Sequence, residues 1–207
     1  MTMPAGEHRD ALMEAIRLEG EAHRALLEGD AATAAERLRA AAAAYRRSWE
    51  LAPPRSFGRL IGMLKALVIA GDDPRAEATY VREQVGEHDA SPPAWYALAI
   101  AALVEGDDPL ARRAAEGMRA AGVEPFLRTA TAIDALARGN GGAYAEAEAA
   151  IVADFERRSE HLTGVAIADT ALMLERFAER RGVQARPSSA LLPGGSADQR
   201  AGDRVAE

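Results

Sequence analysis

The sequence contains no cysteine, which excludes several kinds of chemistry at once. Without thiols the chain can form no disulfide framework, no thiolate metal site and no cysteine nucleophile. The absence also fits a reducing compartment, and the first ten residues contain no basic segment followed by an apolar run. We therefore expect a cytoplasmic protein without a secretory signal.

Lysine is almost absent as well, since Lys65 is the only lysine among the 25 lysine and arginine residues. Acidic residues outnumber basic ones, and the formal net charge is −7. Proteins that bind nucleic acid usually concentrate positive charge, because the release of counterions from phosphates drives their affinity. The acidic balance therefore argues against a nucleic-acid partner.

Long hydrophobic runs and strand patterns are also missing. The longest apolar run, residues 94–104, has about half of the roughly 20 residues that a membrane span requires. Aromatic residues make up only 5% of the chain, β-branched residues are sparse, and alanine, the best helix former, is abundant. These features predict an all-α protein without a membrane partner, in which residues 94–104 form a buried helix.

Apolar residues recur with helical spacing near the N-terminus. One stripe consists of Leu12, Ile16, Gly20, His23 and Leu27, and a second of Ala34, Leu38, Ala41, Tyr45 and Trp49. Each stripe has the period of a helix with one buried face, so the two helices should pack against each other. Gly29 and Asp30 lie between them, where glycine ends one helix and aspartate caps the next.

This unit recurs along the chain. An apolar helix end followed by Gly and then Asp or Asn occurs at Gly29, Gly71, Gly106 and Gly139, with spacings of 42, 35 and 33 residues. Alanine-rich helices are predicted after these glycines, over residues 31–51, 74–85, 109–121 and 143–158, and a last helix over residues 165–181. Periods of this length indicate about nine helices in stacked antiparallel pairs, with the last helix capping the stack.

The first unit resembles a tetratricopeptide repeat. In that family a repeat of about 34 residues has small residues at the helix crossing, a turn similar to Gly-Asp, and an alanine, an aromatic residue and a proline towards its end. The matching residues here are Gly29, Asp30, Ala34, Ala41, Tyr45, Ser48 and Pro53. The resemblance covers residues 8–158 and implies an α-solenoid whose first helices line a groove that binds a peptide or a partner helix.

The composition changes sharply after residue 182. Residues 183–207 are small, polar and helix-breaking, which predicts a disordered tail behind a single domain over residues 1–182. The only apolar patch of this tail is Leu191-Leu192-Pro193. It would either dock on the last helix or stay unstructured, and we favour the second alternative.

Sequence motifs for known chemistry are absent. The chain has no Gly-x4-Gly-Lys phosphate loop, no Gly-x-Ser-x-Gly elbow, no dinucleotide glycine fingerprint, and no His-Glu-x-x-His or Glu-x-x-His motif. We therefore predict no catalytic residue, no cofactor and no metal ligand. A metal site would have to be assembled from ligands far apart in the sequence.

Two histidines have polar neighbours that chemistry could use. His23 lies on an apolar face with Glu19 one turn earlier, so it could be a general base oriented by a carboxylate. The interpretation we favour is a histidine at the edge of the core, bonded to Glu19 or to a backbone carbonyl. His161 lies in a polar junction before Asp169, and such junctions are more often turns that satisfy their own backbone.

Two further patterns have structural interpretations. The carboxylates Glu146, Glu148, Asp154 and Glu156 are expected on the solvated side of an amphipathic helix. Gly58 and Gly62 are expected to let two helices approach closely.

The function we expect is a non-enzymatic protein–protein interaction module that binds a protein or peptide. Arg17, Arg24, Arg59 and Arg128 flank apolar helix faces and would form a basic patch for a carboxylate-bearing partner. The alternative, which we favour for these side chains, is that they pair with nearby acidic residues over the rim.

Two other functions stay open. Residues 172–193 loosely resemble the end of some all-helical bacterial immunity families, which would make the chain an inhibitor of a toxin. An enzyme would instead use His23 or His161 with Glu19 or Asp169, and a deep cavity containing either histidine would favour it.

Overall fold

The computed structural model describes residues 6–86 and 91–194, and within them it contains nine α-helices and no strand. The helices are α1 (Glu7–Glu28), α2 (Ala31–Leu51), α3 (Gly58–Ala70), α4 (Arg75–Val85), α5 (Pro92–Glu105), α6 (Asp108–Ala120), α7 (Glu124–Ala137), α8 (Gly141–Glu156) and α9 (Asp169–Arg181). The all-α prediction is confirmed. In the same two segments, no helix combines the length and the hydropathy needed to cross a bilayer.

The local signals at the helix ends act as expected in three of the four units. All four glycines, Gly29, Gly71, Gly106 and Gly139, take positive φ angles where their helices end. The units differ in the residue that follows the glycine. The Asp30 carboxylate accepts the first-turn N–H of Thr33 at 3.0 Å, and Asp107 and Asn140 cap α6 and α8 in the same way. Asp72 differs, because its carboxylate accepts hydrogen bonds from Arg39 and α4 begins only after Pro74.

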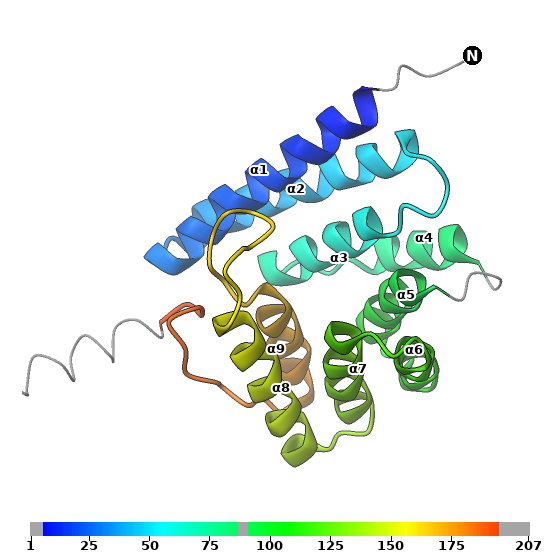
Figure 1. Ribbon diagram of the computed structural model, residues 1–207, viewed down its shortest axis with the longest axis vertical. Helices are drawn as coiled ribbons and strands as arrows, with labels where there is room; N and C mark the ends of the chain where they lie inside the picture. Colours follow the sequence, from blue (N-terminus) through cyan, green and yellow to red (C-terminus); the bar gives the residue numbers. More distant parts are fainter. Residues whose placement is uncertain (1–5, 87–90, 195–207) are drawn as a thin grey trace, which may run out of the picture.

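Consecutive helices pack closely along most of the chain, and α3, α5 and α7 form an inner row (Figure 1). The last helix, α9, packs against α3 and α7 as well as against α8. It therefore returns to the middle of the molecule, whereas the sequence placed it at the end of a stack. It also begins at Asp169, four residues after the predicted start at residue 165.

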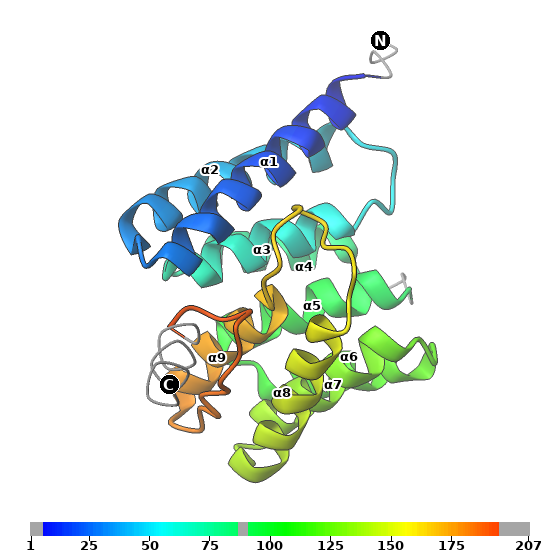
Figure 2. The same cartoon turned by 60° about the vertical axis from the view of Figure 1, so that its left-hand side comes forward.

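The connection between α8 and α9, residues 157–168, crosses in front of α3 (Figure 2) and also contacts α1. A glycine in α1 makes room for it. A Cβ atom on Gly20 would lie 3.0 Å from the backbone oxygen of Thr163, closer than most Cβ contacts. The missing side chain of Gly20 therefore lets the backbone at Thr163 lie directly against α1.

A second glycine brings α2 and α3 together. A Cβ atom on Gly62 would lie 2.7 Å from a ring carbon of Tyr45, so the aromatic ring occupies the space of the missing side chain. The close approach predicted from Gly58 and Gly62 is confirmed for Gly62 only, because nothing lies within 4 Å of a Cβ on Gly58.

The start of the predicted disordered tail differs from the expectation. Residues 183–194 pack on the fold, with the Leu192 side chain buried. The Glu175 carboxylate of α9 accepts the backbone N–H groups of Ala185 and Arg186 at 2.9 and 3.0 Å. Residues 183–189 are not helical, so the Glu175 carboxylate supplies the acceptors that helical backbone carbonyls would otherwise give to these two N–H groups. Residues 195–207 lie outside the described residues.

Glu148 corrects another prediction, because its side chain is fully buried and does not face solvent. Neither of its carboxyl oxygens has a hydrogen-bond partner among the described residues. Burial, reinforced by the neighbouring Glu175 carboxylate, raises the pKa of Glu148 to about 9. Glu148 is therefore protonated at neutral pH in the folded protein.

We expect Gly62→Ala to lower the free energy of unfolding by about 1–3 kcal/mol, because the added methyl group overlaps the Tyr45 ring. Gly58→Ala, in the same helix but in open space, should stay within about 0.5 kcal/mol of the wild type. Urea unfolding of both variants tests the contact. Equal stabilities would show that Tyr45 can move aside.

Replacing Glu148 by glutamine should stabilise the protein at pH 7, on the order of 3 kcal/mol. The folded-state pKa of about 9 lies above the ordinary value of 4.5, so the wild type loses stability as the pH rises from about 4.5 to about 9. The gain from Glu148→Gln should therefore vanish near pH 4 and grow towards pH 9. Unfolding at several pH values measures it, with the exposed Glu146→Gln as a control that stays within about 0.5 kcal/mol of the wild type.

Candidate functional site

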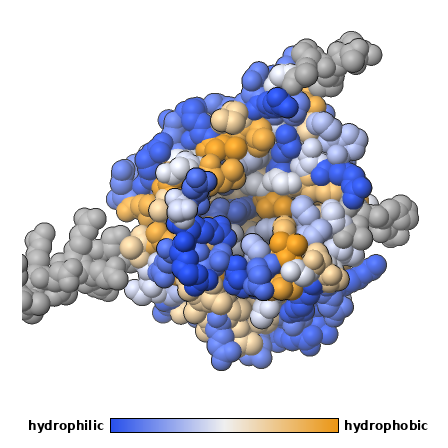
Figure 3. Space-filling model, in the orientation of Figure 1, coloured by the Kyte–Doolittle hydropathy of each residue, from blue (hydrophilic) through white to orange (hydrophobic). Residues whose placement is uncertain are grey.

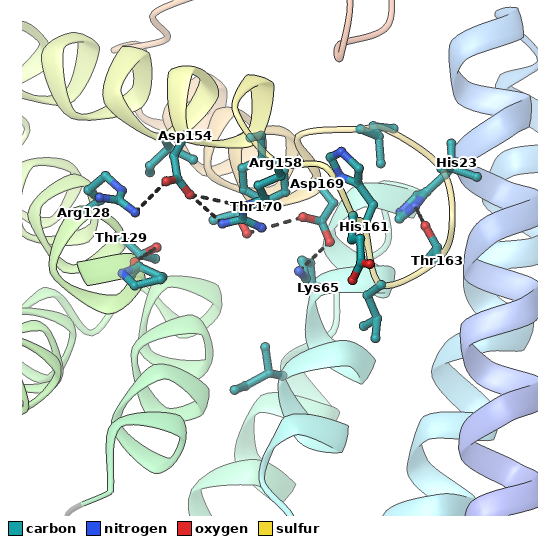
Figure 4. Close-up of a pocket in the computed structure, with 18 of the residues that line it drawn as sticks. His23, Lys65, Arg128, Thr129, Asp154, Arg158, His161, Thr163, Asp169 and Thr170 are labelled. Carbon is teal, nitrogen blue, oxygen red and sulfur yellow. Dashed lines mark hydrogen bonds and ion pairs between the residues drawn. The ribbon is translucent and has the colours of Figure 1, made fainter. Parts of the chain in front are cut away.

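A pocket of about 320 Å³ lies between the inner helices and the α8–α9 connection (Figure 4). Its apolar wall is formed by Ile61, Phe126, Ile151, Phe155, Val165 and Ile167. Its polar lining includes His23, Lys65, Arg128, Asp154, Arg158, His161, Thr163 and Asp169. Seen from outside, this face of the molecule is hollowed, with hydrophobic and hydrophilic residues around the hollow (Figure 3).

An ion pair forms the inner end of the pocket. Lys65 of α3 donates from Nζ to Oδ2 of Asp169 in the first turn of α9, at 2.6 Å. The side chains are only 14% and 17% exposed. Burial alone would raise the pKa of Asp169, but the Lys65 ammonium outweighs it and holds that pKa below its usual value. The pair is therefore ionised, and the positive end of the α9 dipole adds to the stabilisation of the carboxylate.

His23 of α1 lies beside this ion pair and is only 1% exposed. Its Nδ1 is 3.1 Å from the Thr163 hydroxyl oxygen, which replaces the partner expected from the sequence, Glu19 or a backbone carbonyl. Its Nε2 is buried without a hydrogen-bond partner among the described residues. Burial lowers the pKa of His23 to about 4, so the imidazole is neutral at pH 7.

Glu19 lies one turn before His23 and is also buried. Its Oε2 accepts a hydrogen bond of 2.7 Å from the Tyr45 hydroxyl, which the close contact of Tyr45 with Gly62 places there. Burial raises the pKa of Glu19. One side-chain atom each of Glu19, His23 and Asp169 lies within 4.8 Å of the other two.

Arginines occupy the outer part of the pocket. Arg128 Nη2 and Arg158 Nη2 each donate to Asp154 at 2.7 Å, and Arg128 Nη1 also donates to Glu124 at 2.9 Å. A guanidinium has five N–H groups. Both arginines are therefore fixed by Asp154 while N–H groups remain for a further acceptor. Asp154 was expected to be solvated, but it pairs with both arginines at the pocket.

The structure places only Arg128 of the four predicted partner-binding arginines in this pocket. Arg17 pairs with Glu14 and Glu21 of its own helix, as the favoured alternative had it. Arg24 is exposed on α1, and Arg59 donates to the Ser48 hydroxyl at 2.7 Å.

Both histidines considered from the sequence line the pocket together with Asp169. Sequence reasoning missed Lys65, and it included Thr163 and Arg158 only as neighbours of His161 in the polar junction, without a role of their own. Lys65 had a detectable signal, because a single lysine in the middle of the otherwise apolar stretch 60–70 needs a buried counterion. The individual roles of Thr163 and Arg158 had no sequence signal, since they depend on the path of the α8–α9 connection.

Three comparisons with known proteins gave no match: no family model matches the chain, and no curated protein or solved structure is significantly similar to it. The resemblance to tetratricopeptide repeats therefore stays a prediction. The function has to be argued from the pocket.

Removing one member of the ion pair should be costly. We expect Lys65→Met to lower the free energy of unfolding by about 3–5 kcal/mol, because the Asp169 carboxylate is then buried without its counterion. The double variant Lys65→Met/Asp169→Asn should lose less than the sum of the two single variants. Urea unfolding of the four proteins gives the coupling energy, and additive losses would mean that the two groups do not depend on each other.

Proposed function

We propose that the chain is a binding protein that takes a carboxylate-bearing segment of a protein or peptide partner into the pocket beside Arg128 and Arg158. The observation that carries the proposal is the arrangement of the two guanidinium groups, which Asp154 fixes at the pocket without using all their N–H groups. Arginine held in this way recognises carboxylates with two parallel hydrogen bonds.

The rest of the lining supports a peptide occupant. Phe126, Ile151 and Phe155 offer an apolar wall next to the arginines, which suits an apolar side chain adjacent to a carboxylate. His161 lies near the same wall, with its ring centroid 6.2 Å from that of Phe155. Glu160 also lines the pocket, so we expect it to disfavour a ligand with several negative charges.

An enzyme is the second candidate, and one observation favours it. His23 lines the pocket, and its Nε2 has no partner within the described part of the chain, so this nitrogen is placed to accept a proton; burial, which lowers the pKa of His23 to about 4, makes it a weak base at pH 7. If the protein turns over any small-molecule substrate, loss of this activity in His23→Gln but not in His161→Gln would support an enzyme.

Selection from a library of random peptides displayed with free C-termini tests the binding function. We expect enrichment of peptides that carry Asp, Glu or a C-terminal carboxylate next to an apolar residue. The variant Arg128→Gln/Arg158→Gln should bind the selected peptides at least 10-fold more weakly, because each lost charged hydrogen bond is worth about 1.5–3 kcal/mol.

Arg17→Gln/Arg24→Gln is the matched control, since both positions lie outside the pocket. It should bind the selected peptides as the wild type does. The proposal is wrong if no carboxylate-bearing sequence is enriched, or if the control loses as much affinity as the pocket variant while both keep their helical circular dichroism.

A further inference from the structure

Each of the three side chains Glu19, His23 and Asp169 is held by a different partner from another part of the chain. Tyr45 donates to Glu19 Oε2, Thr163 lies at His23 Nδ1, and Lys65 donates to Asp169 Oδ2. Each of these hydrogen bonds occupies one atom of its side chain. On Asp169 the second oxygen, Oδ1, also accepts a long hydrogen bond of 3.5 Å from the Thr170 hydroxyl. Metal ligands are typically oriented by such outer hydrogen bonds.

The atom left over on His23 is the second observation that points to a ligand. Nε2 is buried and has no hydrogen-bond partner among residues 6–86 and 91–194. A buried polar nitrogen without a partner costs about 1–3 kcal/mol. The ring is 1% exposed, so bulk water does not supply the missing partner. A bound group beside Nε2 would remove this cost.

We infer that Glu19, His23 and Asp169 form a binding site for one divalent transition-metal ion at the inner end of the pocket. An imidazole with two carboxylates suits Zn²⁺, Mn²⁺ or Fe²⁺, whereas Ca²⁺ and Mg²⁺ prefer oxygen ligands alone. One possible ligand atom from each of the three side chains lies within 4.8 Å of the other two. Metal bonds of about 2.0–2.2 Å place ligand atoms about 3–4 Å apart, so the three groups need to close in by about an ångström.

The charges around the site are compatible with a cation. With both carboxylates ionised, Glu19, Asp169 and Lys65 sum to one negative charge, and His23 is neutral as a ligand must be. Lys65 holds Asp169 by Oδ2, and the Thr170 hydroxyl donates a long hydrogen bond of 3.5 Å to Oδ1, so an ion would bind Oδ1 through its second lone pair. His23 and Asp169 line the pocket, so the open positions of the ion face water or a pocket ligand.

Zn²⁺ titration of the chelator-treated full-length protein tests the site. Calorimetry should show one Zn²⁺ per chain, and His23→Gln and Asp169→Asn should each weaken binding at least about 100-fold. Tyr45→Phe removes only the hydroxyl that holds Glu19 and should weaken binding by about 10–100-fold. His8→Gln, a histidine outside the pocket, should bind Zn²⁺ as the wild type does.

Imidazole ¹⁵N spectra of the wild type keep the test valid if His23→Gln does not fold. Zn²⁺ should shift the Nε2 resonance of His23 and leave its Nδ1 bound to Thr163. The proposal is overturned if Zn²⁺ does not bind, if Zn²⁺ shifts only the His161 resonances, or if His8→Gln abolishes Zn²⁺ binding. Arg128→Gln/Arg158→Gln should keep the Zn²⁺ affinity, so failure of the metal site and failure of peptide binding are separate results.

Discussion

The ion pair between Lys65 and Asp169 is the interaction on which the inner part of the molecule depends. It joins two residues 104 positions apart and fixes the first turn of α9 against α3. Because a buried charge without a counterion is very unfavourable, the pair favours the position of the first turn of α9 beside Lys65. The α8–α9 connection contacts α1 through Thr163, which lies beside Gly20 and His23, and it closes one side of the pocket.

Small residues allow the buried polar groups to meet. Gly62 admits the Tyr45 ring, whose hydroxyl reaches Glu19, and Gly20 admits the connection that carries Thr163 to His23. In both cases the close packing ends in a contact between polar groups, Tyr45 with Glu19 and Thr163 with His23. The same close packing that stabilises the helices therefore positions polar groups that, taken alone, destabilise the fold.

The sequence determined the local features of the fold reliably, because helix ends depend on a few neighbouring residues. The observed ranges of α2, α4, α6 and α8 differ from the predicted ranges by at most two residues at each end. The return of α9 to α3 was not predictable in this way, since it depends on a pairing between distant charges. Helical periodicity also failed at Glu148, because it identifies one buried face and α8 is covered on a second side by α9 and the segment after it.

The candidate site was predictable only in part, for a related reason. The apolar stripe of α1 placed His23 inside, and the polar junction drew attention to His161 and Asp169, but no spacing rule connects two residues 140 positions apart, as His23 and Thr163 are. The arginines illustrate the limit, because a flanking position on a helix does not say which neighbour faces it. Arg17 and Arg128 occupy similar positions and both pair with a glutamate of their own helix, yet Arg128 also reaches Asp154 of α8.

A purely structural account of the buried cluster leaves one group unexplained. Tyr45 satisfies one oxygen of Glu19 and Lys65 satisfies one of Asp169, so these contacts could serve folding alone. His23 is different, because its buried Nε2 has no hydrogen-bond partner within residues 6–86 and 91–194, and an apolar residue of similar volume would fill the same space without that cost. The histidine therefore lowers stability at a position that opens into a pocket, and functional sites are where such local costs are commonly retained.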